Sequence, residues 1–574
     1  MTARRLPAAA TPRRLLVVVL LVALALRAWN AGWGLPFTYH PDEHQYVDSA
    51  VAMLGGNLDP VRFTNPTLLK YAYALLFAAV AATGRALGQW PSLAAFQDAF
   101  AADPTSTYAM ARLVTALFGT LTVALVYRLG RRVHSRHAGL VAAALLAGTF
   151  LHARDSHFAV NDVLTALLTT LVLDAAVGLS FGWRAGRARR TRRLLLGAAA
   201  VGLAAATKYS AAAVAVPLAL GYVLGRDGSS TRGRSTPAPA WLGRLLDGRL
   251  ILAGLVAAVV FLAAVPYAVL RPGAFLADVA QLAERGREGF KGVAIDPAPG
   301  WIYYLESLAW GMGPLMLAMA IAGLARAVAG RHGAAGWVVA SLPLLLWGYL
   351  GSQLLMFERF MIPALPALAV LAAAAAVDLG RWLAGRGRRG PFAGRPAVAI
   401  AALAALLVVQ PLASTVRLDL LLGREDTRTE AKRWLEANVP EGTAVLAQSN
   451  GPELADVDDP QPPPQTLRRF ALTELDTLEL PELPPEAWRD AGHTVLVVSS
   501  FSSDRRLLDP AKDAAHRAYY AQLHAGWPLL AEFAPFAGDR KPPFVFAQLY
   551  GPATQVYRFA RPGPMIRVYD VNRE

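Results

Sequence analysis

The chain has 574 residues, of which 55% are hydrophobic and 17% are charged, a smaller charged fraction than soluble domains carry, so an ordinary soluble protein is excluded. It contains no cysteine, which excludes disulfides, thiolate catalysis and cysteine metal sites. Its net charge of +15 resides in arginine clusters between apolar runs, an arrangement that is typical of cytoplasmic loops of membrane proteins and not of a nucleic-acid-binding face.

The first predicted element is a membrane span over residues 15–35. Basic residues precede its apolar run, as in a signal peptide, but no small-residue cleavage site follows it. We therefore expect an uncleaved span with the N-terminus on the cytoplasmic side. Further spans are predicted near residues 108–130, 137–152, 158–182, 194–207, 209–225, 250–270, 301–326, 335–356, 359–380 and 396–416.

The arginine clusters orient these spans. They mark cytoplasmic ends at residues 128–136, 184–193, 226–249, 326–332 and 381–395. The eleven crossings then place everything after residue 416 on the outer side. A Gly/Ser/Pro-rich stretch at 227–240 reads as a flexible linker on the inner side.

Residues 66–84 form another apolar stretch that is long enough to cross the membrane. If it crossed, the arginines at 128–136 would move to the outer side, against the charge rule. We therefore predict a juxtamembrane or re-entrant helix within an outer loop of residues 36–107, with a genuine crossing as the alternative. The fold class is mainly α, with about 11–13 transmembrane helices.

Charged residues and prolines return in a soluble tail of residues 417–574, which follows the membrane domain of residues 1–416. Residues 426–438 predict an amphipathic helix, ended by the turn sequence at 439–442. Residues 443–448, 494–499 and 565–571 predict strands. The tail is therefore expected to be a small extracytoplasmic α/β domain.

Residues 39–46 (YHPDEHQY) place two carboxylates, two histidines and two tyrosines directly outside the first span. One interpretation is a polar loop in which Pro41 stops the helix. The other is a carboxylate base, Asp42 or Glu43, held at the membrane surface by its neighbours.

Residues 152–162 (HARDSHFAVND) form a second ionisable cluster at the outer end of the next helical pair. Asp162 is expected about one turn inside an apolar helix, where charge is costly and usually faces a cavity or a partner. The simpler interpretation of the cluster is a polar helix end in which Arg154 pairs with Asp155.

Cations are also predicted on the outer side of the membrane, beside these two acidic clusters. Lys208 and Arg359 each lie between two spans on the outer side, where they could bind a phosphate or simply anchor the helices in the interface. Asn65 and Lys70 flank the 66–84 stretch. Acids that accept a proton and cations that neutralise a phosphate therefore converge on one surface.

With these motifs in this order, residues 1–420 resemble the GT-C glycosyltransferases, specifically the dolichyl-phosphate-mannose protein mannosyltransferase and aminoarabinose transferase group. The resemblance rests on His40-Pro41-Asp42-Glu43, on the run from Arg154 to Asp162, on residues 202–209 (GLAAATKY) and on residues 359–363 (RFMIP). Many relatives carry a Lys/Pro-Pro-Leu pattern where this chain has residues 65–70 (NPTLLK), so Lys70 stands one helical turn later.

The resemblance implies an inverting membrane glycosyltransferase that moves a sugar from a polyprenyl-phosphate donor to an acceptor hydroxyl on the outer face. Asp42 then looks like the base, with Glu43 beside it, and Asp162 matches the acid that orients acceptor or sugar. The remaining expected site residues are Lys208, Arg359, Arg154 and Lys70 at the donor phosphate, and His157, Tyr46 and Asn65 at the substrates.

The expected setting is a bacterial inner or plasma membrane with a periplasmic or extracellular tail. The acceptor is expected to be a protein, lipid A of lipopolysaccharide, another cell-envelope polysaccharide or another glycan, and nucleic acid is not an expected partner. No cofactor and no metal site are expected. His40, Asp42, Glu43 and His44 could bind a divalent ion, but four ligands within five residues rarely reach good geometry.

Two other functions fit the same composition. A lipid-linked-sugar flippase or another transporter would also place charges in the membrane, but near its midplane and on paired broken helices. An inactive scaffold of the same fold would not need Asp42, Asp162 and Lys208 together.

Overall fold

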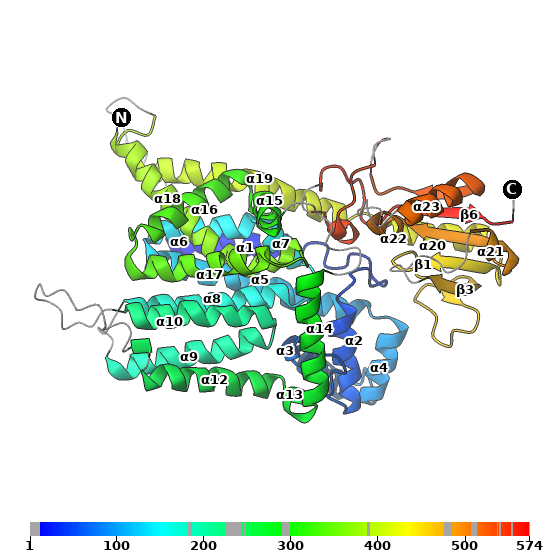
Figure 1. The fold of residues 1–574 in the computed structure, drawn as a ribbon, viewed down its shortest axis with the longest axis horizontal. Coiled ribbons are helices and arrows are strands. Elements are labelled where there is room, and N and C mark those ends of the chain that lie inside the picture. Colours follow the sequence, from blue (N-terminus) through cyan, green and yellow to red (C-terminus); the bar gives the residue numbers. More distant parts are fainter. Residues whose placement is uncertain are drawn as a thin grey trace, which may run out of the picture.

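The computed structural model describes residues 12–181, 186–225, 244–245, 247–289, 299–386, 391–475, 485–506, 514–536, 538, 541–552 and 555–572. The predicted linker at 227–240 and the arginines before residue 12 lie outside them. Figure 1 shows a bundle of roughly parallel helices with a small α/β domain at one end, and the N-terminus at the other. The chain is therefore built as a membrane bundle with a C-terminal domain beyond one end.

Five of the described helices are long and apolar enough to cross a membrane, and a sixth span results if one bent pair is counted as a unit. The five are α5 (Thr105–Val133), α8 (Asp162–Ser180), α17 (Gly333–Gly351), α18 (Leu365–Gly385) with η4 (Glu358–Ala364) before it, and α19 (Pro396–Leu422). Other helices of the bundle are α1 (Pro12–Ala28), α6 (Arg136–Gly148), α9 (Arg187–Ala205), η3 (Tyr209–Val214) with α10 (Ala215–Leu224), and α12 (Gly248–Ala264). The chain is a multi-pass membrane protein.

The predicted continuous span at 301–326 is wrong. It consists of α15 (Gly300–Met312) and α16 (Pro314–Val328), whose axes differ by 117°. Gly313 between them has φ +90°, which favours glycine, and Pro314 starts a new helix because its ring cannot continue the old one. The uninterrupted hydrophobicity of the segment concealed this break.

Helices of the predicted outer loop lie at the same end as the tail. They are α2 (His44–Ala52), η1 (Met53–Gly55), α3 (Leu68–Ala86) and α4 (Leu93–Ala102), and a later strap adds α13 (Tyr267–Leu270) and α14 (Pro272–Glu288). Figure 1 shows α2, α4 and α14 running across the direction of the spans. The 66–84 stretch, now α3, is not among the helices that pass as spans, and its position outside the bilayer stays a prediction.

The tail begins with α20 (Thr427–Asn438) and contains one sheet of six strands in the order β2-β3-β1-β4-β6-β5. The strands are β1 (Ala444–Gln448), β2 (Ala455–Asp456), β3 (Arg469–Leu475), β4 (Val495–Ser499), β5 (Leu529–Phe533) and β6 (Ile566–Asp570). β1 is parallel to β3 and β4, while β6 is antiparallel to β4 and β5. The helices α21 (Pro485–Asp490), α22 (Ser500–Arg506) and α23 (Ala514–Gly526) and the turn η5 (Phe546–Leu549) complete it.

The predicted helix and all three predicted strands of the tail are confirmed, whereas β2, β3 and β5 were not predicted. The missed strands lie toward the sheet edges, where β5 has only five residues, all of them exposed or half-buried.

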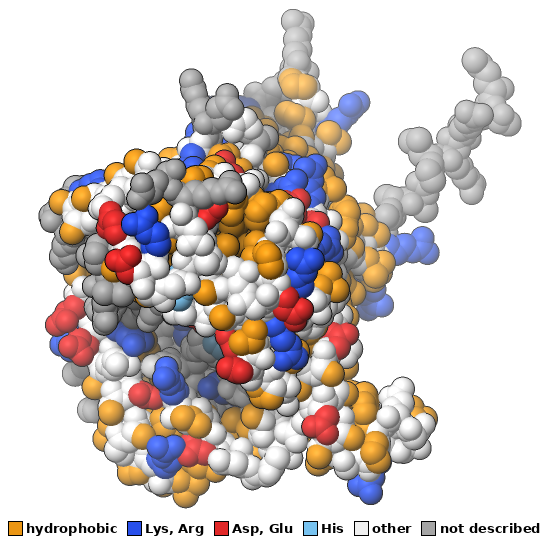
Figure 2. Space-filling view, turned by 90° about the vertical axis from the view of Figure 1, so that its right-hand side faces the viewer, with side chains coloured by type: hydrophobic (Ala, Val, Ile, Leu, Met, Phe, Trp, Pro, Cys, Tyr) orange, Lys and Arg blue, Asp and Glu red, His pale blue; other side chains and the backbone are white. Residues whose placement is uncertain are grey.

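Figure 2 views the tail end of the molecule and shows basic and acidic side chains interspersed among the described residues of this face.

Two apolar clusters cover the two faces of the tail sheet, one under α20 and one under α21 and α23. A much larger cluster fills the membrane bundle and the outer-loop helices. That cluster also includes Leu549, Tyr550 and Phe559 of the tail. The tail is thus packed into the end of the bundle that carries the predicted site.

Candidate active site

Asp42 lies in the loop between α1 and α2, where Pro41 prevents the helix from starting earlier. Its side chain is 28% exposed and pairs with Arg359, with 3.0 Å between Oδ2 and Nη2. The amide of Gln45 donates to Oδ1 over 3.4 Å. One oxygen is therefore held by a cation, and the other remains accessible with only a long hydrogen bond.

Glu43 has the opposite surroundings, although it is the next residue. Its carboxylate is fully buried and accepts from Arg112 Nε and Nη2 at 2.8 and 2.7 Å. The backbone N–H of Ala159 donates to it as well, over 2.7 Å. Because Arg112 also donates to the carbonyls of Ala31 and Trp33, this ion pair joins the first outer loop, α5 and the second outer cluster.

Asp162 is the first residue of α8, so it lies at the helix end and not one turn inside as expected. Its Oδ1 is 2.6 Å from Nζ of Lys208, which has extended backbone just before η3. Nζ also lies 4.2 Å from the centre of the Phe360 ring, beside Arg359. The second acid is thus paired with one predicted phosphate-binding cation and adjacent to the other.

The acids from the two separate loops meet around Tyr46, which is buried in α2. Burial raises the pKa of its phenol well above the ordinary value, and the negative charges of Asp42 and Asp162 raise it further. Both carboxylates therefore lie close enough to the Tyr46 phenol to raise its pKa. Asp42, Asp162 and Arg359 thus lie together at the tail end of the bundle, although more than 300 residues of sequence separate the first from the last.

His40 supports this arrangement from behind. Its Nδ1 accepts from the backbone N–H of Asp42 over 3.2 Å, and its ring packs between Phe158 and Tyr550. Burial, followed by the charges of nearby arginines, lowers the pKa of His40 well below its usual range. The ring is therefore neutral at physiological pH and serves to fix the backbone beside Asp42.

Arg154 lies beneath the site and not at its surface. It is fully buried, and Nε donates to Asp155 over 2.8 Å. Its Nη1 is 3.8 Å from Glu358 and donates to the carbonyl of Gly551 over 3.2 Å. It therefore braces the connection that carries Arg359.

The remaining predicted residues lie around this centre at different distances. Nδ2 of Asn65 donates to Gln45 over 2.5 Å, and Gln45 in turn donates to Asp42. Lys70 is buried in α3, and burial lowers its pKa to about 8. His157 turns away from the cluster, with Nε2 3.0 Å from the buried Asp419 of α19.

Two residues of the site were not identified from the sequence. Arg112 could have been, because a charge within the apolar run of α5 needs a buried partner. Tyr550 gave no local signal. It comes from the tail, yet its hydroxyl accepts from Nη1 of Arg359 over 3.2 Å.

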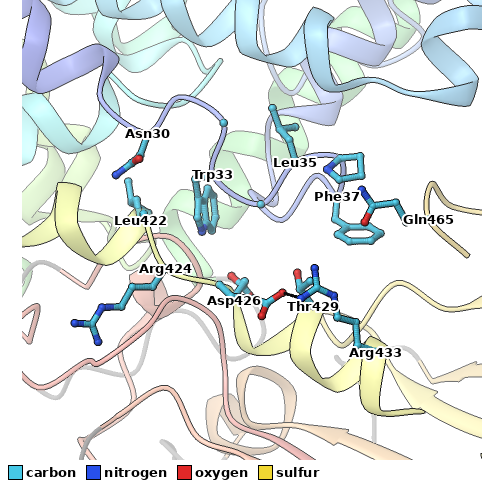
Figure 3. A pocket seen from close by; sticks show the side chains of 15 residues that line it. Asn30, Trp33, Leu35, Phe37, Leu422, Arg424, Asp426, Thr429, Arg433 and Gln465 are labelled. Carbon is cyan, nitrogen blue, oxygen red and sulfur yellow. Dashed lines mark ion pairs between the residues drawn. The ribbon is translucent and has the colours of Figure 1, made fainter. Parts of the chain in front are cut away.

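A separate cavity of about 460 Å³ lies between the first outer loop and the start of the tail. Figure 3 shows Trp33, Leu35 and Phe37 of the loop facing Asp426, Thr429 and Arg433 of the tail across it. None of the predicted site residues lines this cavity. Among the described residues, no group of three or more His, Asp or Glu side chains is arranged to hold a metal ion.

The chain is similar to known proteins in part of its sequence and in its fold. A model of the dolichyl-phosphate-mannose-protein mannosyltransferase family matches residues 89–246. A solved oligosaccharyltransferase from Archaeoglobus fulgidus, tethered to an acceptor peptide, has a TM-score of 0.51 and 15% identity, over 86% of this chain and 70% of its own. AglB from the same organism, with an inhibitory peptide and a dolichol-phosphate, has a TM-score of 0.50 and 14% identity, over 91% and 73%.

ArnT from Cupriavidus metallidurans, bound to undecaprenyl phosphate, has a TM-score of 0.49 and 16% identity, over 91% of this chain and 97% of its own. A comparison with curated protein sequences returns no match. The family match and the archaeal structures confirm the resemblance to GT-C glycosyltransferases and the predicted fold class, a polytopic helical membrane protein with a small C-terminal sheet.

Proposed function

We propose that this chain, which has the GT-C fold, is a membrane glycosyltransferase that transfers a sugar from a polyprenyl-phosphate donor to an acceptor hydroxyl, with inversion. One observation carries the proposal. An accessible carboxylate, Asp42, pairs with Arg359, and a second cation, Lys208, packs on the neighbouring Phe360 at the end of the bundle where the tail packs. A base and a phosphate site are the two requirements of this reaction.

In the proposed reaction, Asp42 accepts the proton of the acceptor hydroxyl while the oxygen of that hydroxyl attacks the anomeric carbon of the sugar. The bond between that carbon and the phosphate oxygen breaks, and the electron pair leaves with the lipid phosphate. A single displacement of this kind inverts the configuration. Of the two adjacent acids, Asp42 is the one that can reach the acceptor, because 28% of its side chain is exposed whereas the side chain of Glu43 is fully buried.

Arg359 and Lys208 would stabilise the phosphate as it departs. They pair with Asp42 and Asp162. A bound phosphate competes for both cations, so donor binding would free Asp42 to act as a base and Asp162 to orient acceptor or sugar. The donor is a phosphodiester with one negative charge, and the lipid phosphate gains negative charge as its bond to the sugar breaks, so the two cations would bind the departing group more tightly than the donor.

The other predicted residues take supporting roles in this proposal. Glu43, Arg154 and His157 are engaged in buried ion pairs, which suits positioning better than contact with substrate. Asn65 acts through Gln45 on Asp42. Tyr46 lies between the two acids, and Lys70 supplies a further cation on α3.

The donor class is supported by the family match and by the dolichol-phosphate in the archaeal structure of the same fold. The acceptor would be a protein, lipid or glycan hydroxyl on the outer face of a bacterial plasma membrane. The reaction would need no cofactor; near Asp42, Glu43 is already paired with Arg112, and Asp42 itself is paired with Arg359.

The test is a transfer assay with purified protein in proteoliposomes. The vesicles receive polyprenyl-phosphate sugars labelled in the sugar, together with membrane extract as the acceptor source. We expect label in an extract component and release of unlabelled lipid phosphate. Label that only crosses the bilayer on its original lipid would contradict the proposal and favour a flippase.

A further inference from the structure

A short segment of the tail enters the membrane bundle. Residues 546–549 form the turn η5, and Tyr550 follows with only 1% of its surface exposed. Tyr550 belongs to the apolar cluster of the bundle and not to either cluster of the tail sheet. The segment therefore crosses from one unit into the other.

Tyr550 contacts two residues of the predicted site, Arg359 and Arg154, and the histidine behind Asp42. Nη1 of Arg359 donates to its hydroxyl over 3.2 Å. Its ring centre lies 4.4 Å from that of His40, and the guanidinium of Arg154 lies 5.3 Å from the ring centre. The tail thus touches the proposed phosphate-binding arginine, the ring behind Asp42 and the arginine beneath the site.

The backbone around Tyr550 fixes the segment in place. The carbonyl of Leu549 accepts from Arg428 over 3.3 Å, and that of Gly551 accepts from Arg154 over 3.2 Å. Gly551 has φ +137°, and a Cβ there would lie 2.7 Å from Leu418 of α19. The positive φ favours glycine here, and a Cβ would also have to displace the Leu418 side chain.

An aromatic chain connects the tail sheet to the same arginine. Phe501, the second residue of α22 after β4, packs on Phe546, with 5.2 Å between ring centres. Phe546 packs on Phe357 at 4.9 Å, and the guanidinium of Arg359 lies 4.6 Å from the centre of the Phe357 ring. Side chains of the tail therefore restrain Arg359 from two sides.

We propose that Tyr550 is a positioning residue that holds Arg359 for the donor phosphate, so that the tail completes the phosphate site. This inference rests on the proposed function. The guanidinium is a planar fork, and Tyr550 on Nη1 with Asp42 on Nη2 fixes its plane. A phenol suits this role because it orients the cation without cancelling the charge that a phosphate needs. Burial raises the pKa of Tyr550 to about 12, which keeps it neutral.

The experiment measures binding of a polyprenyl monophosphate that carries no sugar to the purified full chain in detergent. Tyr550→Phe removes the hydroxyl and keeps the ring contacts. The matched control is Tyr557→Phe, also in the tail, whose ring is 60% exposed and whose hydroxyl lies 3.3 Å from Ser414. We expect Tyr550→Phe to raise Kd about tenfold, the size typical of a hydrogen bond to a charged group, and Tyr557→Phe to leave Kd unchanged.

Arg359→Gln completes a double-mutant cycle. In that background Tyr550→Phe should have no further effect on Kd, a readout that a general loss of packing would not give. Equal Kd values for the wild type and Tyr550→Phe, or an undiminished effect without Arg359, would overturn the inference while leaving the proposed function standing. A wild type that binds no lipid phosphate would overturn the proposed function itself, and the inference with it.

Discussion

The carboxylate of Asp42 and the guanidinium of Arg359 form an ion pair, 3.0 Å between Oδ2 and Nη2, that joins the first outer loop to the connection before α18. In our proposal these two residues serve different substrates, the acceptor and the donor phosphate. Their pairing therefore links the two binding events. A lipid phosphate that takes Arg359 leaves Asp42 free, so binding at the phosphate site would make the base available to the acceptor.

Lys208→Ala should weaken donor binding more than it damages the fold. Lys208 pairs with Asp162, and 18% of its side chain but only 4% of that of Asp162 is exposed, so we expect a modest loss of stability beside a larger loss of binding. We expect the Kd for polyprenyl phosphate to rise about tenfold, as for loss of one charge-assisted hydrogen bond. Arg85→Ala, an exposed cation at the end of α3, is the control for net charge. Equal losses in both variants would remove Lys208 from the phosphate site.

Glu43→Ala should lower the folding stability of the protein. It leaves the guanidinium of Arg112 buried without its counter-charge, which typically costs about 3–5 kcal/mol. We expect a marked fall in the thermal unfolding midpoint in detergent, whereas Asp98→Ala on the exposed face of α4 should leave it unchanged. A Glu43→Ala protein of normal stability that is inactive would instead assign a chemical role to this acid.

Cysteine labelling tests the predicted position of α3. The chain contains no cysteine, so Arg62→Cys and Asp98→Cys each introduce a single exposed thiol, one before α3 and one after it. If α3 lies outside the bilayer, no span separates the two positions, and a membrane-impermeant reagent should label them from the same side. Labelling from opposite sides would mean that α3 crosses the membrane.

Chelation should leave transfer unchanged. Glu43 is paired with Arg112 and Asp42 with Arg359, so two of the four residues of the acidic loop that could hold a divalent ion already have a cationic partner. The measurement is the transfer rate after treatment with a chelator and removal of free ions. Activity that falls and returns on adding a divalent cation would contradict the metal-free proposal.

The sequence predicted the parts of the site that depend on topology. Asp42, Asp162, Lys208 and Arg359 each lie where an apolar run ends on the same side, so counting spans was enough to bring them to one surface. Hydrophobic periodicity likewise predicted the central strands of the tail. The bend at Gly313 was missed because an apolar run reads as one span even when Gly-Pro interrupts it.

Contacts between segments that are far apart in the chain could not be predicted from the sequence. Tyr550 meets Arg359 across 191 positions, and nothing near Tyr550 distinguishes it from other tail aromatics. The different roles of Asp42 and Glu43 were also hidden, because they depend on which neighbour faces Arg112 and which faces solvent. Burial and pairing of this kind follow from packing in three dimensions and not from local pattern.

The central claim is that Asp42 is the base of a lipid-phosphate-dependent glycosyltransferase. The most direct measurement is the rate of sugar transfer from labelled polyprenyl-phosphate sugar by Asp42→Asn, with donor binding and thermal stability measured alongside and Asp98→Asn as the control. Loss of a general base predicts a rate at least about 10²-fold lower, with the fold and donor binding retained. Near-normal transfer by Asp42→Asn would contradict the account.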